Sequence, residues 1–137
     1  MSDDLWSEIK HFRPSEFDSP DAPGSGQLMN IEFIKLLNKI RAQCQFPFTI
    51  NSGYRTKEHN AVVAQVEKSA HTTGNACDIS AHSGLERFAI VKYALENGIT
   101  RIGIANSFVH LDLDYTKPQS VIWLYSNDGT FVEDKTA

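Results

Sequence analysis

The sequence predicts an α+β domain in which helices flank a mainly antiparallel sheet. Segments with helical and strand-like patterns are mixed along the chain, without the regular strand–helix–strand repeat of a parallel sheet. Two of the strand candidates alternate apolar and polar residues, as half-buried strands do. The chain has 137 residues, of which 41% are hydrophobic and 22% charged, so we expect a single domain over residues 1–137 with an ordinary core.

Helical signals occur in four places along the chain. The expected helices are Leu5–Phe12, Ile31–Cys44 after the cap residue Asn30, Lys57–Ala64 after Thr56, and 84–96 after Ser83. In the last of these, Ser83 and Glu86 have the spacing of a capping box, and Gly98 ends the helix. Its apolar stripe is expected at Leu85, Phe88, Val91 and Leu95.

Five segments are expected to be strands: Phe48–Tyr54, Ala76–Ser80, Ile102–Ile104, Phe108–Leu113 and Val121–Tyr125. In Ala76–Ser80, Asp78 points to the face opposite the apolar pair Cys77 and Ile79. In Phe108–Leu113, His110 and Asp112 likewise lie opposite the apolar residues. If these two strands are neighbours in one sheet, Asp78 and His110 converge on one point.

Charge and composition exclude several classes of protein. The formal net charge is −4, with 13 Lys and Arg against 17 Asp and Glu, so we expect no nucleic-acid partner and no basic helix lying on a membrane. No segment approaches 18 apolar residues, and the first twelve residues lack the apolar run of a secretory signal. We therefore expect no membrane partner and synthesis in the cytoplasm. Cys44 and Cys77 are interpreted as two free thiols in the core rather than a disulfide.

Two histidines and one carboxylate form a candidate metal site. His71 lies seven residues before Asp78, in the loop that leads into its strand, and His110 lies on the proposed neighbouring strand. Two imidazoles and one carboxylate suit zinc and leave a fourth position for water. Spacing alone leaves another interpretation open, in which His71 is a surface residue and His110 a hydrogen-bonded strand histidine. The sequence lacks the HExxH helix of zincin-type proteases.

Arg55 follows the first predicted strand, and its guanidinium can hold a carboxylate through two parallel hydrogen bonds. The alternative is a solvated arginine at a strand end.

Three blocks stand out in chain order: SGYRTKEHN at 52–60, SAHTTGNACDI at 69–79 and FVHLD at 108–112. They resemble the SGYR-x-x-x-x-N segment, the SxHxxGxAxDI motif and the closing FVHxD strand of the zinc D-Ala-D-Ala carboxypeptidase family, whose fold is shared with the hedgehog signalling domain. With the loop at Phe17–Asn30, the resemblance covers nearly the whole chain.

This resemblance implies the hedgehog/D-Ala-D-Ala-peptidase fold and one zinc ion held by His71, Asp78 and His110. It implies a peptidase that cuts peptidoglycan stem peptides, of the D,D-carboxypeptidase or endopeptidase type, through attack of a zinc-bound water on an amide carbonyl. Arg55 would bind a substrate carboxylate, and Ser69 would orient its loop or touch substrate. We expect a monomer. The missing secretory signal fits a phage-type lytic enzyme that reaches the wall through a pore made by another protein, and it equally fits a cytoplasmic enzyme that acts on free wall peptides.

One position departs from the family's pattern. Many members carry an acidic general base three residues before the last zinc histidine, where this chain has Ser107. Asp112 is the candidate catalytic base in its place, but it could equally be the partner that fixes the His110 imidazole. Because of Ser107, a non-catalytic zinc-binding domain that serves as a binding module is kept as the alternative function.

Overall fold

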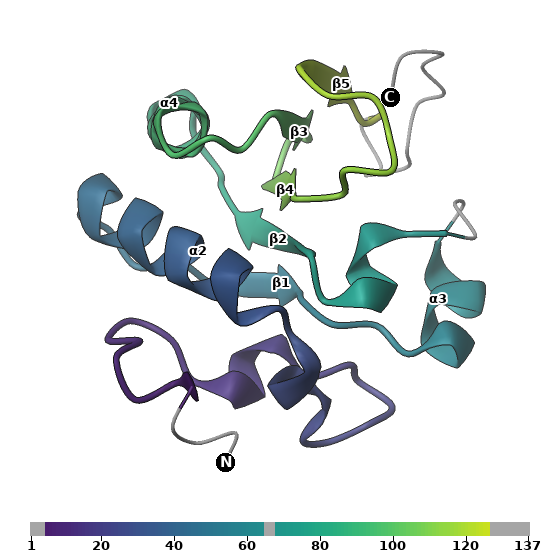
Figure 1. Cartoon of the computed structure of the whole chain (residues 1–137). Coiled ribbons are helices and arrows are strands. Elements are labelled where there is room, and N and C mark those ends of the chain that lie inside the picture. Colours follow the sequence, from purple (N-terminus) through teal and green to yellow (C-terminus); the bar gives the residue numbers. More distant parts are fainter. Residues whose placement is uncertain (1–4, 65–67, 127–137) are drawn as a thin grey trace.

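The computed structural model describes residues 5–64 and 68–126. The helices are α2 (Ile31–Cys44), α3 (Lys57–Val63) and α4 (Gly84–Glu96), with the short 3₁₀ helices η1 (Pro14–Phe17), η2 (Ser25–Leu28) and η3 (Ala70–Thr73). The strands are β1 (Ile50–Ser52), β2 (Ala76–Ser80), β3 (Arg101–Ile104), β4 (Phe108–Asp112) and β5 (Val121–Leu124). All five strands form one sheet (Figure 1).

The sheet has the strand order β1-β2-β4-β3-β5. The pairs β1–β2, β2–β4 and β3–β4 are antiparallel, and only the edge strand β5 runs parallel to its neighbour β3. The prediction of an α+β fold with a mainly antiparallel sheet is therefore confirmed.

The two faces of the sheet have different roles. In Figure 1, α2 and α4 lie on one side of the strands and α3 on the other. The α2 residues Phe33 and Leu37 share one buried cluster with Cys77, Val109 and other apolar residues of β2 and β4. Because side chains alternate along a strand, the ionisable residues of β2 and β4 are turned to the opposite face.

Each predicted cap residue accepts the expected backbone hydrogen bond. The side chain of Asn30 accepts from the Glu32 amide at 3.0 Å, at the start of α2. Thr56 accepts from the His59 amide at 3.0 Å, and Ser83 from the Glu86 amide at 3.1 Å. The starts of the three helices are thus determined by local sequence, as predicted. Cys44 and Cys77 are free thiols, as also predicted.

The segment before Pro14 differs from the prediction. Of the expected helix Leu5–Phe12, only Leu5 is helical, because residues 6–8 are turns and no helix continues through residues 9–12. Trp6 and Phe12 are both buried in the core. Six residues apart, they would lie on different sides of a helix, so an irregular chain is needed to bury both.

The first strand is shorter than the expected Phe48–Tyr54. Beyond Ser52 the chain leaves the sheet, and the Tyr54 amide donates to the carbonyl of Phe17 at 2.8 Å. Gly53 permits this approach, since a Cβ there would lie 2.7 Å from Cα of Phe17. The contact brings the N-terminal segment beside the residues that carry the candidate site.

The predicted apolar stripe of α4 is wrong at three of its four residues, and only Val91 packs against the core as expected. Leu85, Phe88 and Leu95 are 75%, 69% and 49% exposed, whereas Ile90 and Ala94 are fully buried. The helix carries apolar residues on both sides, so periodicity did not determine which side faces the core. Two polar contacts orient it: Arg87 donates to the Asn106 carbonyl at 2.9 Å, and Asn97 donates to the Gln43 side chain of α2 at 2.7 Å.

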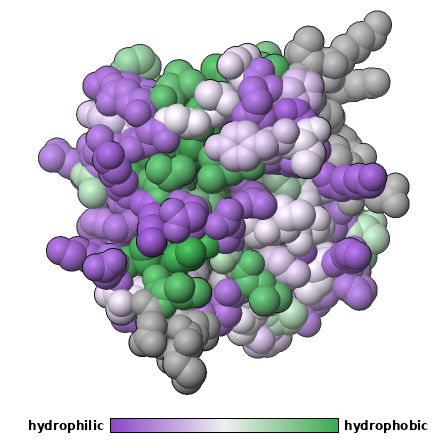
Figure 2. Space-filling view, in the orientation of Figure 1, coloured by the Kyte–Doolittle hydropathy of each residue, from purple (hydrophilic) through white to green (hydrophobic). Residues whose placement is uncertain are grey.

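Apolar and polar side chains are interspersed on the surface that includes α2 and α4 (Figure 2). Among the described residues, no helix combines the length and the apolar character needed to cross a membrane. The described residues share one sheet and one large core cluster.

Candidate metal centre

His71 is fixed by local structure on both sides of its ring. It lies in η3, where the Ser69 hydroxyl caps the turn by accepting from the His71 amide at 3.2 Å. Its Nδ1 lies 2.7 Å from the carbonyl oxygen of Gly53, so Nδ1 carries the proton and donates it there. The unprotonated Nε2 then faces Oδ1 of Asp78 at 3.5 Å.

Strand register brings Asp78 and His110 together. They are directly paired residues of β2 and β4, on the face away from α2 and α4. Nδ1 of His110 lies 2.8 Å from Oδ1 of Asp78, and the ring centroids of His71 and His110 are 5.2 Å apart. The convergence expected from the alternation pattern is present.

The three side chains fit a zinc ion. One ligand atom from each of His71, Asp78 and His110 can be chosen so that all three lie within 4.8 Å of one another, and all three residues are buried. Ligand atoms around a tetrahedral zinc, each at about 2.1 Å, lie roughly 3.4 Å apart. Small movements of the side chains would therefore give this spacing, with nitrogen and oxygen ligands that zinc accepts.

Asp112 lies behind His110 rather than in front of the three ligands. Its Oδ2 is 2.7 Å from Nε2 of His110, and its Oδ1 accepts from Nε of Arg101 at 2.9 Å and from the Asp114 amide at 3.0 Å. The side chain is 2% exposed. These contacts match a residue that orients an imidazole ligand.

Arg55 is brought beside the candidate ligands. Its Nη2 lies 3.7 Å from Oδ2 of Asp78, Nη1 donates to Asn60 at 3.3 Å and Nε donates to Ser52 at 3.2 Å. The side chain is 15% exposed, so it is not a solvated arginine at a strand end. Each terminal nitrogen carries two N–H groups, so donors remain for a further partner.

Three residues of the site surroundings escaped the sequence analysis: Arg101, Trp123 and Tyr125. Arg101 stacks on the Trp123 ring at 4.9 Å and donates to the Pro118 carbonyl at 2.6 Å. The Trp123 ring is 5.3 Å from that of His110, and Tyr125 stacks on Phe108 at 4.9 Å. The observation that would have identified Arg101 is its strand pairing with Asp112, which is visible only once the strand order is known.

Other polar residues in and near the three sequence blocks do not join the ligand group. Ser107, Glu58 and His82 are exposed, and His59 is half-buried in α3. His82 contacts the Ser80 hydroxyl at 2.9 Å.

Charge inside the site is balanced by close pairing. Burial lowers the pKa of His110, but hydrogen bonds to Asp112 and Asp78 outweigh it and raise that pKa to about 9. Burial raises the pKa of Asp78, but the hydrogen bond with His110 and the charge of its ring hold that pKa well below its usual range. Burial lowers the pKa of His71. The site thus holds ionised Asp78 beside a neutral His71, and a cation competes with a proton for Nδ1 of His110.

Fold and site together define an α+β protein with a buried His–Asp–His group suited to a metal. The family model of peptidase M15 matches residues 10–112, which include all three of these residues. The chain therefore belongs to the peptidase M15 family, which confirms the family-level expectation from the three sequence blocks.

Comparison with solved structures agrees with this fold. The crystal structure of the L-Ala D-Glu endopeptidase ChiX from Serratia marcescens is similar, with a TM-score of 0.51 and 16% sequence identity. The match covers 81% of this chain and 96% of that chain. At this identity the likeness concerns the fold alone. No curated protein matches the chain significantly.

Proposed function

We propose that the chain is a zinc peptidase that hydrolyses amide bonds in the peptides of bacterial peptidoglycan. The observation that carries the proposal is the buried group of His71, Asp78 and His110 in a member of the peptidase M15 family. The similarity to an endopeptidase named for the L-Ala D-Glu bond supports a wall peptide as substrate. Both the endopeptidase and the D,D-carboxypeptidase type fall within this proposal.

In this proposal, His71, Asp78 and His110 would hold one zinc ion, through Nε2, Oδ1 and Nδ1 respectively. When bound, zinc supplies a Lewis acid that polarises the scissile carbonyl and lowers the pKa of water towards 7. The chain's own residues supply the geometry. Gly53 sets the tautomer of His71 through its carbonyl, and Asp112 does the same for His110 from the far side of its ring.

Asp112 is proposed as a positioning residue rather than the general base. Both of its oxygens already accept hydrogen bonds or contact the imidazole, and the side chain is shielded from solvent. A base must reach the water whose proton it takes. The His110 ring lies between Asp112, which contacts Nε2, and Asp78, which contacts Nδ1. Asp112 therefore acts through His110.

Arg55 and Ser69 remain the proposed substrate contacts. Arg55 is anchored by Ser52 and Asn60, which fixes its guanidinium beside Asp78 with N–H groups left to bind a carboxylate. Ser69 is the cap of η3 and thereby sets the position of His71.

A monomeric state, and release to the wall through a separate pore, stay predictions from the sequence.

A digest of purified peptidoglycan tests the function. The zinc-loaded chain is incubated with sacculi and with soluble stem peptides, and the products are identified by mass spectrometry. We expect shortened peptides whose masses identify the bond, and none with Asp78→Ala. A chain that binds zinc stoichiometrically and releases no product would overturn the peptidase and support the non-catalytic zinc-binding domain, which the exposed Ser107 keeps as the second candidate.

A further inference from the structure

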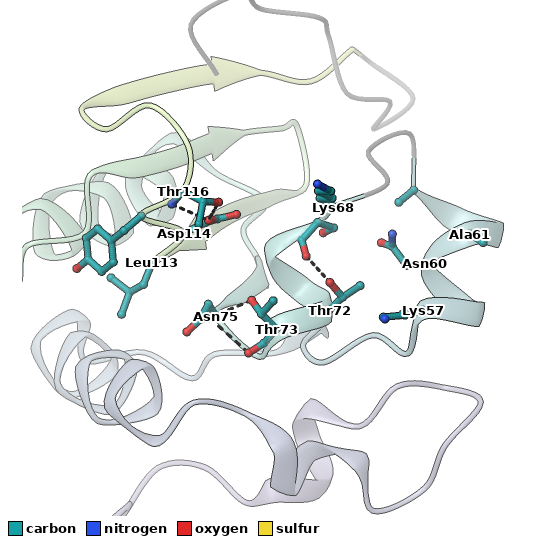
Figure 3. Close-up of a pocket in the computed structure, with 13 residues that line it drawn as sticks. Lys57, Asn60, Ala61, Lys68, Thr72, Thr73, Asn75, Leu113, Asp114 and Thr116 are labelled. Carbon is teal, nitrogen blue, oxygen red and sulfur yellow. Dashed lines mark hydrogen bonds between the residues drawn. The ribbon is translucent and has the colours of Figure 1, made fainter.

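A groove lies beside the candidate metal centre, between α3, η3 and the segment after β4 (Figure 3). Its volume is about 990 Å³. That is at the upper end of the roughly 300–1,000 Å³ typical of ligand sites, so it can hold several residues of a peptide. Lys57 and Asn60 line it from α3, Ser69 and Thr72 from η3 and its cap, and Asp114 from the segment after β4.

Three lining residues connect the groove to the candidate site. Asn60 accepts from Arg55, Ser69 accepts from the His71 amide, and the Asp114 amide donates to Asp112. The groove is therefore linked to the candidate site through these three hydrogen bonds, and an extended chain could run from the metal centre into it.

The groove is lined by positive charge, whereas the net charge of the protein is negative. Lys57 and Lys68 are both exposed, and neither side chain forms an ion pair with any of the described residues. The one acidic lining residue, Asp114, is already paired with Lys117 at 3.2 Å. Within residues 5–64 and 68–126, two positive charges without an ion-pair partner thus line this groove, in a chain of formal net charge −4. In Figure 3 the Lys57 side chain extends from α3 toward η3.

Arg55 by itself can bind at most one carboxylate of a substrate that carries more than one. It is already engaged by Ser52, Asn60 and Asp78, and it is largely buried. A second carboxylate farther along the substrate needs another cation, and the groove supplies two. The exposed ring of Tyr115 adds an apolar surface at the groove's rim.

We propose that this groove binds the acidic part of the peptide substrate, with Lys57 and Lys68 pairing with a carboxylate several atoms away from the scissile bond. The inference rests on the proposed function, because it identifies the substrate as a peptide with a free side carboxylate. A peptide that contains D-Glu has such a group. The lysines are specificity residues here and take no part in the chemistry at the metal centre.

Binding of two matched peptides tests the proposal without any turnover. The probes are the tripeptide L-Ala-D-Glu-L-Lys with its D-Glu carboxylate free, and the same peptide with that carboxylate amidated. Each is titrated into the ¹⁵N-labelled full chain, first without added metal and then with zinc. We expect the acidic peptide to shift the amide resonances of residues 57–61 and 113–116, and to bind more weakly as ionic strength rises.

Charge reversal in the groove supplies the matched variants. Exposed ion pairs are individually weak, so Lys57→Glu with Lys68→Glu should weaken the acidic peptide by about tenfold and leave the amidated peptide nearly unchanged. Lys10→Glu with Lys39→Glu, at two exposed positions outside the groove, is the control for the same change of net charge. Any of four results would overturn the proposal. They are equal binding of the two peptides, resonance shifts outside the groove, no binding of either peptide, or equal affinity of the groove variant and the control variant for the acidic peptide.

Failure of the groove and failure of the proposed function give different results. If the zinc-loaded chain binds the acidic peptide in the groove but cleaves no wall peptide, the groove stands and the peptidase is wrong. If the chain cleaves wall peptides and the lysine variant shows an unchanged KM, the groove is wrong and the peptidase stands.

Discussion

Asp112 and Asp78 contact opposite nitrogens of the same imidazole, that of His110. Oδ2 of Asp112 lies 2.7 Å from Nε2, and Oδ1 of Asp78 lies 2.8 Å from Nδ1. The first carboxylate is held in turn by Arg101, on the neighbouring strand β3. The ring is therefore oriented by a chain of charged contacts that lies away from His71, and only one of its nitrogens is directed at the ligand group.

Asp112→Asn should weaken zinc binding by about 10- to 100-fold, the range found when the partner of a metal-bound histidine is removed. The amide cannot offer the same charged acceptor to Nε2 of His110 while it also accepts from Arg101. Competition against a chelating dye measures the affinity. At saturating zinc, wall-peptide turnover should return to within about tenfold of the parent value, since Asp112 is not the general base in this proposal.

The control for this variant is Glu96→Gln, which removes an exposed carboxylate on α4. It should change neither zinc affinity nor turnover. Full zinc affinity in Asp112→Asn together with lost turnover would show that Asp112 takes a proton itself, and the positioning role would be wrong.

Gly103→Ala should disturb the site through packing. Gly103 pairs with His110 on one side and with Trp123 on the other, and an added Cβ would lie 2.6 Å from Nε1 of Trp123 and 2.7 Å from the Tyr125 ring. The aromatic rings would have to move, at a cost of about 1–3 kcal/mol in unfolding free energy. Urea unfolding measures this cost, and Gly84→Ala, where a Cβ meets nothing within 4 Å, is the control.

Zinc should stabilise the chain and require His71 to do so. A ligand that binds only the folded state at 100 times its Kd adds about 2.7 kcal/mol to the unfolding free energy. We expect zinc to raise the melting temperature of the parent chain, and EDTA to reverse the effect. His71→Ala should abolish the shift, while His82→Ala, at an exposed position, should keep it. An equal shift in both variants would remove His71 from the ligand group.

The face of its strand on which each of Asp78 and His110 lies was predictable because it depends on local pattern. Alternation in β2 and β4 determines which residues share a face, and the helix caps at Asn30, Thr56 and Ser83 follow from short-range hydrogen bonds. These features need no knowledge of the distant chain.

The supports of the site were not predictable in the same way. Arg101 meets Asp112 only because β3 lies beside β4, and Trp123 reaches His110 only because β5 pairs with β3 across Gly103. Strand order is decided by the whole fold, so no local pattern contains it. The early strand end at Gly53 likewise depends on a contact with Phe17, far away in sequence.

The orientation of α4 gives the last prediction. Periodicity placed Phe88 in the apolar stripe, but the structure leaves it 69% exposed and buries Ile90 fully. Ile90→Ala should therefore lower the unfolding free energy by about 2–5 kcal/mol, because it leaves a cavity between helix and sheet. Phe88→Ala should change it by only about 0.5 kcal/mol, as most surface substitutions do. Both substitutions introduce alanine into the same helix, so the two variants differ in helix propensity by less than about 1 kcal/mol. Urea unfolding of the two proteins compares the sides of the helix directly. A larger loss for Phe88→Ala would mean that α4 turns its predicted stripe to the sheet, and that the contacts of Arg87 and Asn97 do not orient it.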